Sequence, residues 1–302
     1  ASDAPDHVKR QADYICDGTD DHEEIQAAID ALPNYGGSVY VTGGTYICTG
    51  TIVLPSNTHL KFENGAKMII PEAHNLSGYL SGELASIPAL FAAITVEHHG
   101  EGDWNENIHI EGAHIDFLGW TDLDGDYAGI LINRGYNCLI ERCVVENVNP
   151  EAGHYNVGIF VVNSKNTNTV RCEGNNCGYE GLDPASRASE NCYAIDCGGF
   201  SNGTHSMQIS SHSTTGLQPR SCGFIRCYGD GRIILHGAGG PATPPRDILF
   251  LECVTAGRLD LIGSAHNTVF RGCHRYITPL RFSKGISIRA QDTGDVIDGV
   301  VI

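Results

Sequence analysis

The sequence contains no long hydrophobic run and few basic residues. No stretch approaches the roughly 20 apolar residues that a membrane-spanning helix needs, so the sequence predicts no insertion into a membrane. Nineteen basic residues stand against 36 acidic residues, which gives a formal net charge of −17. This excess of negative charge argues against nucleic acid and anionic membrane surfaces as general partners. Only 5 of the basic residues are Lys, and Arg is better suited to fixed contacts with carboxylates.

Helical signals are also scarce. The segment GTDDHEEIQAAIDALP at 18–33 has apolar residues at i, i+3, i+4 and i+7 behind an Asp-rich start, which predicts a short amphipathic helix over 20–32. The rest of the chain consists of short β-rich runs separated by Gly, Pro and Asn. We therefore expect an all-β fold.

The chain has 12 Cys residues, but their spacing matches no zinc motif. One interpretation is a disulfide framework, which is typical of small domains that lack a core. The interpretation that we favour is a set of buried thiols stacked in successive repeats. Cys16 with Cys48 is the pair in which a bond is most to be expected. The other ten form four C-x4-C pairs followed by two single residues: Cys138/Cys143, Cys172/Cys177, Cys192/Cys197, Cys222/Cys227, Cys253 and Cys273.

From residue 128 on, the chain divides into segments that each read as strand, polar turn, strand and Cys. If Ile130, Ile159, Leu182, Met207, Ile233 and Leu259 are equivalent, the steps are 29, 23, 25, 26 and 26 residues. A period near 25 without helices predicts a β-solenoid, in which each unit buries its apolar side on its neighbours. The spaced Leu and Asn residues of a leucine-rich horseshoe, the rival solenoid, are absent.

Side chains alternate between the two faces of a strand, so the first strand of each segment has a predicted inner and outer set. The inner set is nearly all aliphatic, whereas the outer set changes from apolar to polar along the chain. The predicted inner residues are Ile130/Ile132, Ile159/Val161, Leu182/Pro184, Met207/Ile209, Ile233/Leu235 and Leu259/Leu261. The predicted outer residues are Leu131/Asn133, Phe160/Val162, Asp183/Ala185, Gln208/Ser210, Ile234/His236 and Asp260/Ile262.

The opening DGTDDHEEIQAAIDALP…GGSVYVTGGTY and the repeats of the NCYAIDC and SCGFIRC type resemble the pectate-lyase-like superfamily. That group includes pectate lyases, polygalacturonases, alginate epimerases and phage tailspikes. The resemblance covers essentially the whole chain and implies a right-handed parallel β-helix solenoid with a short N-terminal capping helix. A single domain is expected over 1–302, with an N-terminal strand and the capping helix in 1–33, early coils in 34–127 and regular coils in 128–302. The resemblance also implies a polysaccharide partner and an extracellular location, secreted, on a cell surface or on a virion.

Candidate functional residues gather on the outer face of the later coils. Hydrolysis of a sugar chain needs a carboxylic acid and a carboxylate, whereas β-elimination from a uronate needs a cation and a base. Ordinary solvated side chains are the alternative interpretation of the same pattern. We assign catalysis to Asp183, His236, Arg232 and Tyr179, and substrate binding to Gln208, Asp260, Arg258, His205, Glu180 and Asp230. Of these, Tyr179, Glu180, His205 and Asp230 are expected in the turns that lead into the sheet.

The string Tyr179-Glu180-Gly181-Leu182-Asp183-Pro184 is similar to the Y-x-G-x-D-P core of alginate C5-epimerases, in which the Tyr and the Asp are catalytic. That family has a His soon after the Pro, whereas this chain has Ala185, which speaks against epimerisation unless His205 or His212 takes its place. The paired Asp, Gly-His-Gly and Arg-Ile-Lys motifs of polygalacturonases are absent.

None of this chemistry requires a cofactor, and we assign no residues as metal ligands. The Asp residues of TDLDGDY, which are Asp122, Asp124 and Asp126, offer oxygens to Ca²⁺. The string lacks Gly at the position that an EF-hand loop requires and also lacks the final Glu, so we interpret it as an Asp-rich turn that is at most a candidate calcium site.

Two functions remain open. The first is an extracellular enzyme that cleaves or modifies an acidic polysaccharide, with lyase chemistry favoured over hydrolysis and epimerisation. The second is a non-catalytic, glycan-binding surface fibre such as a tailspike or adhesin. Aliphatic residues that are predicted to lie exposed on the sheet favour the second function, because such a face is typical of a trimer or another homo-oligomer. They are Leu131, Phe160, Val162, Ile234 and Ile262.

Overall fold

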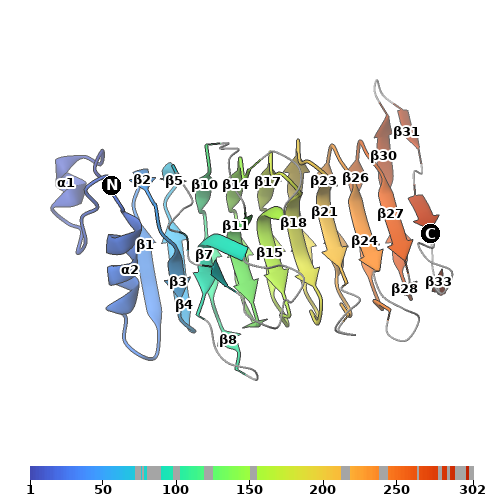
Figure 1. Ribbon diagram of the computed structural model, residues 1–302, viewed down its shortest axis with the longest axis horizontal. Helices are drawn as coiled ribbons and strands as arrows, with labels where there is room; N and C mark the ends of the chain where they lie inside the picture. Colours follow the sequence, from blue (N-terminus) through green and yellow to red (C-terminus); the bar gives the residue numbers. More distant parts are fainter. Residues whose placement is uncertain are drawn as a thin grey trace.

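Short parallel strands stack into three long sheets along one axis of the molecule. The computed structural model describes residues 1–71, 76, 78–79, 90–97, 103–118, 125–149, 155–211, 218–237, 244–263, 265–277, 281–283, 286–289 and 297–298. The coils follow one another along the axis in sequence order, with the N-terminal helices at one end (Figure 1). Each coil adds a strand to each sheet, so the right-handed parallel β-helix predicted from the sequence is confirmed.

The strand order within each sheet follows the order of the coils. Sheet 1 contains β1 (Gly37–Val41), β4 (Thr58–Phe62), β9 (His109–Glu111), β13 (Leu139–Glu141), β16 (Asn168–Val170), β19 (Tyr193–Ile195), β22 (Gly223–Ile225), β25 (Leu249–Leu251) and β29 (Val269–Arg271). Sheet 2 contains β2 (Gly44–Ile47), β5 (Ala66–Ile69), β10 (His114–Asp116), β14 (Val144–Glu146), β17 (Glu173–Asn175), β20 (Gly198–Phe200), β23 (Tyr228–Gly229), β26 (Val254–Thr255), β30 (His274–Ile277) and β31 (Arg281–Ser283). Sheet 3 contains β3 (Ile52–Leu54), β7 (Leu90–Val96), β11 (Asp126–Asn133), β15 (Asn156–Val162), β18 (Glu180–Ser186), β21 (His205–Ser210), β24 (Ile233–Gly237), β27 (Leu259–Gly263) and β32 (Ile286–Arg289).

Four short strands pair beside these sheets, and two strands join them antiparallel. The pairs are β8 (Asn105–Glu106) with β12 (Gly135–Tyr136) and β28 (Ala265–His266) with β33 (Ile297–Asp298). The antiparallel strands are β6 (Gly78–Tyr79), which pairs with β7, and β31, which pairs with β30. Within the described part of the chain, no helix is both long and apolar enough to cross a membrane.

The N-terminal end is closed by helices rather than by a strand. Residues 1–33 contain α1 (Asp6–Lys9) and α2 (His22–Asp30), so the strand predicted there is wrong, while the capping helix is confirmed. Helix α2 buries Ile25 and Ile29 against the first coils. The carboxylate of Asp21 accepts hydrogen bonds from the backbone N–H groups of Gly18 and Ile47, both at 2.7 Å, which tie the start of the helix to β2.

The predicted inner column forms the core of sheet 3. The first inner residue of each coil pairs in register with the equivalent residue of the next coil, and all of these side chains are buried. The prediction fails at one position, because the register shifts between β18 and its neighbours. Ala185, and not Pro184, lies opposite Ile209 and enters the core.

All 12 Cys residues are buried free thiols, so the expected bond between Cys16 and Cys48 is wrong and the stacked-thiol interpretation is confirmed. The stacking is regular, since the backbone N–H of Cys143 donates to the Sγ of Cys172 at 3.3 Å and the N–H of Cys172 donates to the Sγ of Cys197 at 3.4 Å. Burial raises the pKa of Cys16 to about 12 and also raises that of Cys48. The reactive thiolate form of these two residues is therefore rare at neutral pH.

We expect thiol labelling under native conditions at neutral pH to modify almost none of the Cys residues, because all 12 are buried. After unfolding in denaturant without a reductant, all 12 should react, and intact-protein mass spectrometry would count them. A stable population with two unreactive residues, restored by reductant and mapped to Cys16 and Cys48, would contradict the free-thiol state.

Candidate functional site

The outer face of sheet 3 is divided into an apolar half and a polar half. On β7, β11 and β15 the outward side chains form a buried apolar cluster, with Tyr155 packed against it. Ile234 on β24 is also buried, and Ile262 on β27 is half-buried. The prediction that these aliphatic residues are exposed, and with it the sequence-based reason for an oligomer, is therefore wrong. The cluster consists of Ala92, Ala128, Leu131, Val157, Phe160 and Val162.

The polar half begins on β18, where two carboxyl groups take up the positions of apolar side chains. Glu180 pairs with Val157 of the previous coil, and Asp183 pairs with Phe160. Both residues lie within the strand, so Glu180 is not in a turn as the sequence predicted, and neither is His205, which begins β21.

A glycine allows this arrangement. A Cβ on Gly181 would lie 2.5 Å from the carbonyl oxygen of Gly174 in β17 and 2.7 Å from that of Ser206. Gly181 therefore faces the interior, as Leu182 does, and this local break in the alternation leaves Glu180 and Asp183 on the same outer face.

The two carboxyl groups are buried and influence each other. Glu180 is 1% exposed and Asp183 is 2% exposed. Burial raises the pKa of Asp183 to about 7, although a hydrogen bond from the hydroxyl of Ser210 at 2.6 Å and the positive charge of Arg187 act in the opposite direction. Burial, and next the charge of Asp183, raises the pKa of Glu180 well above its usual range. Near neutral pH, the pair therefore retains a proton that exposed carboxyl groups would have lost.

Aromatic side chains border this pair at the start of the strands. The ring of Tyr179 lies 4.6 Å from that of Tyr155 and 6.1 Å from that of His205, measured between centroids. Burial, followed by the charge of Glu180, raises the pKa of Tyr179. Burial and the positive charges of Arg232 and His236 lower the pKa of His205 to about 4, so its imidazole is neutral at neutral pH.

The next coils add an amide, an ion pair and a partly exposed cation. Gln208 is buried, and its Oε1 has no hydrogen-bond partner among the described residues. The Nε of Arg232 lies 3.5 Å from Oδ2 of Asp260, and the side chain of Arg232 is 39% exposed whereas that of Asp260 is fully buried. His236 is half-buried and Arg258 is exposed.

The structure thus brings most of the predicted residues onto one face but separates Asp230 from them. The carboxylate of Asp230 is exposed and accepts the backbone N–H of Ser201 at 2.9 Å, so it caps a turn. Sequence reasoning missed Arg187 and Ser210. Nothing in the sequence indicates a role for Arg187, which has a φ of 58°. Ser210 could have been found, because it is an outward residue on the strand next to the one that carries Asp183.

The face contains no group of metal-binding side chains among the described residues. Asp122 and Asp124 of the candidate calcium turn lie outside the described residues, and Oδ1 of Asp126 accepts the backbone N–H of Tyr155 at 2.7 Å. Two groups elsewhere hold such side chains close together. One is Cys16, Asp21 and Glu24, in which Asp21 already accepts two hydrogen bonds, and the other is His59, His109 and Glu111 on sheet 1.

We expect the contribution of Asp183 to the stability of the protein to fall as the pH rises from about 4 to about 7, whereas His205, with its pKa lowered to about 4, contributes in the opposite direction. Over this range folded Asp183, with its pKa raised to about 7, keeps a proton that the unfolded chain loses, so the unfolded state gains in relative stability. One unit of pKa shift corresponds to roughly 1.4 kcal/mol, so this component amounts to a few kcal/mol. In the variant Asp183→Asn the component should be absent, which urea unfolding of both proteins at several pH values would show. Parallel pH profiles would contradict the raised pKa.

Comparisons with known proteins agree with this architecture. The family model described as "Rhamnogalacturonase A/epimerase, pectate lyase-like" matches residues 16–231. No curated protein has a matching sequence. Among solved structures, a polygalacturonase from Erwinia carotovora ssp. carotovora is similar with a TM-score of 0.57 at 12% identity, and the match covers 95% of each chain.

Two viral proteins are similar over only part of their length. A tailspike protein variant of E. coli bacteriophage HK620, solved in complex with a pentasaccharide, has a TM-score of 0.61 at 14% identity. The match covers 93% of this chain and 58% of the tailspike. The ORF18 protein of Geobacillus virus E2 has a TM-score of 0.60 at 16% identity, with 90% of this chain and 57% of that protein covered.

At these identities the solved structures share the fold and carry no residue-level argument. The family model, in contrast, extends from residue 16, ahead of α2, through β23, and it includes the strand that carries Glu180 and Asp183. The chain belongs to the pectate-lyase-like family of rhamnogalacturonase A and epimerases.

Proposed function

We propose that this protein is an extracellular enzyme that cleaves an acidic polysaccharide, with Glu180 and Asp183 as its acid–base pair. The observation that carries the proposal is the pair itself: two neighbouring buried carboxyl groups, both with raised pKa values, on the outer face of a parallel β-helix. Strongly perturbed carboxyl groups beside a patch of polar side chains are typical of catalytic sites.

Hydrolysis is the reaction that this pair suits best. The protonated carboxyl group donates its proton to the glycosidic oxygen while the bond from that oxygen to the anomeric carbon breaks. The ionised carboxylate either takes a proton from an attacking water or attacks the anomeric carbon itself. Because the charge of Asp183 disfavours the ionisation of Glu180, the pair keeps a proton near neutral pH, so that a protonated and an ionised carboxyl group can be present together.

The cations beside the pair favour an acidic substrate. Arg232 and Arg258 are cations that reach solvent on this face, next to half-buried His236, in a chain whose formal net charge is −17. A uronate carboxylate that binds there would meet Arg232, whose ion pair with Asp260 is long at 3.5 Å. The similar polygalacturonase and the similar tailspike, which was solved with a pentasaccharide, support a polysaccharide partner, and a surface adhesin of Streptococcus pneumoniae with a TM-score of 0.55 supports an extracellular location.

β-Elimination, which the sequence alone favoured, is the second candidate, and Arg232 is the observation that favours it. The guanidinium would neutralise the uronate carboxylate and so acidify the proton on C5. A carboxylate with a raised pKa would take that proton, the bond from C4 to the leaving oxygen would break, and a C4–C5 double bond would form. The glycan-binding fibre without catalysis has lost its sequence-based support from exposed aliphatic residues.

We expect the wild-type chain to release new reducing ends from at least one uronate-containing polysaccharide in a panel. The substitutions Glu180→Gln and Asp183→Asn should each lower kcat/KM by about 100-fold or more, because general acid–base catalysis typically contributes that much. Reducing-end assays and the ultraviolet absorbance of unsaturated uronate products, followed in parallel, separate hydrolysis from elimination.

Glu173→Gln provides a matched control. This carboxyl group lies on sheet 2, where it accepts a hydrogen bond from the hydroxyl of Tyr228 at 3.1 Å, and its removal should leave the rate close to that of the wild type. New reducing ends together with the ultraviolet absorbance of unsaturated uronate products would assign the reaction as β-elimination. If the protein binds a polysaccharide but releases no new reducing ends, the proposal of a cleaving enzyme is overturned and the glycan-binding fibre is the function that remains.

A further inference from the structure

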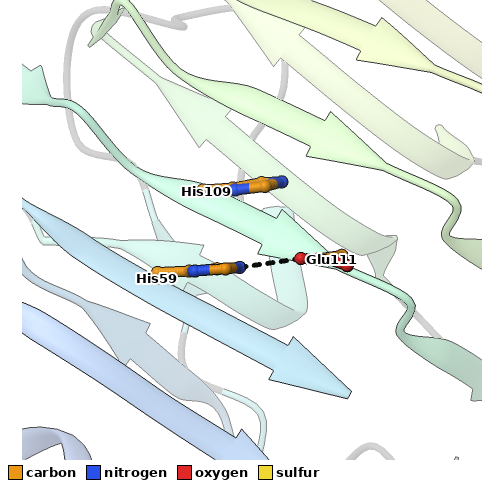
Figure 2. Close-up of side chains that lie close together, drawn as sticks. All are labelled: His59, His109 and Glu111. Atoms are coloured by element: carbon orange, nitrogen blue, oxygen red, sulfur yellow. Dashed lines mark hydrogen bonds and ion pairs between the residues drawn. The ribbon is translucent and has the colours of Figure 1, made fainter. Parts of the chain in front are cut away.

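Two imidazoles and a carboxylate meet on the outer face of sheet 1, far along the chain from the candidate catalytic pair. His59 on β4 lies opposite His109 on β9, and Glu111 lies two residues further on the same face of β9. The two rings are stacked, with centroids 4.2 Å apart and planes at 6° to each other. Figure 2 shows both rings extending side by side and the ring of His59 reaching the carboxylate of Glu111. One potential ligand atom from each residue lies within 4.8 Å of the other two.

We propose that His59, His109 and Glu111 form a binding site for a divalent ion of the zinc, nickel or copper type that joins β4 to β9. Two imidazole nitrogens and one carboxylate oxygen are a ligand set that suits these ions, whereas Ca²⁺ and Mg²⁺ prefer oxygen ligands alone. Three protein ligands leave a fourth position for water.

The ligand atoms are available in the folded chain. The Nε2 of His109 is buried and has no hydrogen-bond partner among the described residues. Burial, and next the neighbouring ring of His59, lowers the pKa of His109, which keeps its ring neutral at neutral pH. Although burial acts against it, hydrogen bonds from Lys61 and His59 hold the pKa of Glu111 below its usual range, so its carboxylate is ionised. Neutral imidazole and ionised carboxylate are the forms that bind metal.

The two oxygens of Glu111 have different partners. Oε1 accepts Lys61 at 3.1 Å and also Arg142, whereas Oε2 contacts only His59, at 3.0 Å, among the ion pairs of this cluster. An ion would replace the proton between His59 and Oε2 and leave Oε1 paired with Lys61 and Arg142. A surface hollow lined by Lys61, Glu111, Gly112 and Arg142 borders the cluster at Glu111, and the side chain of His59 is 31% exposed.

Two features limit the affinity. The lone pairs of parallel rings do not converge, so both imidazoles must tilt toward the ion when it binds. Lys61 and Arg142 are paired with the carboxylate of Glu111, and their positive charge opposes a bound cation. Glu141 lies 3.6 Å from Nε2 of His109, but it is already paired with Arg142 and Arg171. We therefore expect binding in the micromolar range, and we expect it to tighten when Arg142 is removed.

The ion would link two adjacent coils that are joined by a long connection in the sequence. His59 and His109 are neighbours in the sheet but 50 residues apart in the sequence, about twice the 25-residue period of the regular coils. A link that closes a long loop stabilises the folded chain, and an ion that binds only the folded state raises its melting temperature. This ion site is independent of the polysaccharide and of the carboxyl pair.

The test is calorimetric titration of the untagged full chain with Zn²⁺ and, separately, Ni²⁺ at pH 8, together with melting curves at each ion concentration. We expect one ion per chain and a rise in melting temperature that disappears on acidification, when the imidazoles become protonated. His59→Ala and His109→Ala should each weaken binding by about tenfold or more. Cobalt absorption in the visible range should show the mixed nitrogen and oxygen ligands in the wild type and not in the double variant.

His114→Ala is the matched control, because His114 also pairs with a carboxylate, Glu146 at 2.8 Å, but has no second imidazole in a metal-binding group among the described residues. Its affinity should equal that of the wild type, and Arg142→Ala should bind more tightly. Circular dichroism of each variant would confirm that it folds. Absence of binding by the wild type, or binding that the His59→Ala/His109→Ala double variant retains in full, would overturn the proposal.

Discussion

The constraint on which the rest of this structure depends is the in-register hydrogen bonding of one coil to the next. In the stacked coils, a strand pairs parallel with its counterpart about 4.8 Å away, so a residue at one position of an internal coil has the equivalent residues of two other coils as its neighbours. Ile130, Ile159 and Leu182 form part of one such column in the core, and Cys143, Cys172 and Cys197 form part of another. The same pairing on the outer faces determines which charged and aromatic side chains lie next to one another.

On the outer face of sheet 3, this pairing links the apolar half to the chemistry of the polar half. Val157 and Phe160 are the register partners of Glu180 and Asp183, so each carboxyl group stands next to a buried apolar side chain. Such neighbours remove water, and the loss of hydration disfavours the ionised form. The aliphatic residues that suggested an oligomer interface are thus better understood as the surroundings that raise the two pKa values.

The sequence predicted the solenoid, its period and its inner column because hydrophobic alternation is a local property that tertiary contacts reinforce. It failed where the alternation breaks. The irregularities around Gly181 and after Asp183 moved Glu180 and Ser186 to the outer face and Ala185 to the core, and a strict period of two cannot describe either shift. Isolated glycines in β-rich runs were the available signal. The free state of Cys16 and Cys48 depends on their geometry, which spacing does not reveal.

The cluster of His59, His109 and Glu111 was beyond sequence reasoning for a different reason. The regular repeat relates residues about 25 positions apart, but the chain between β4 and β9 is long enough for two coils and contributes only one step to sheet 1. Residues that share a column are therefore 50 positions apart, and no periodic alignment pairs them. Adjacent coils that are joined by a long connection depend on contacts across the sheet for their register. The stacked rings of His59 and His109 and the hydrogen bond between His59 and Glu111 supply such a contact at this step.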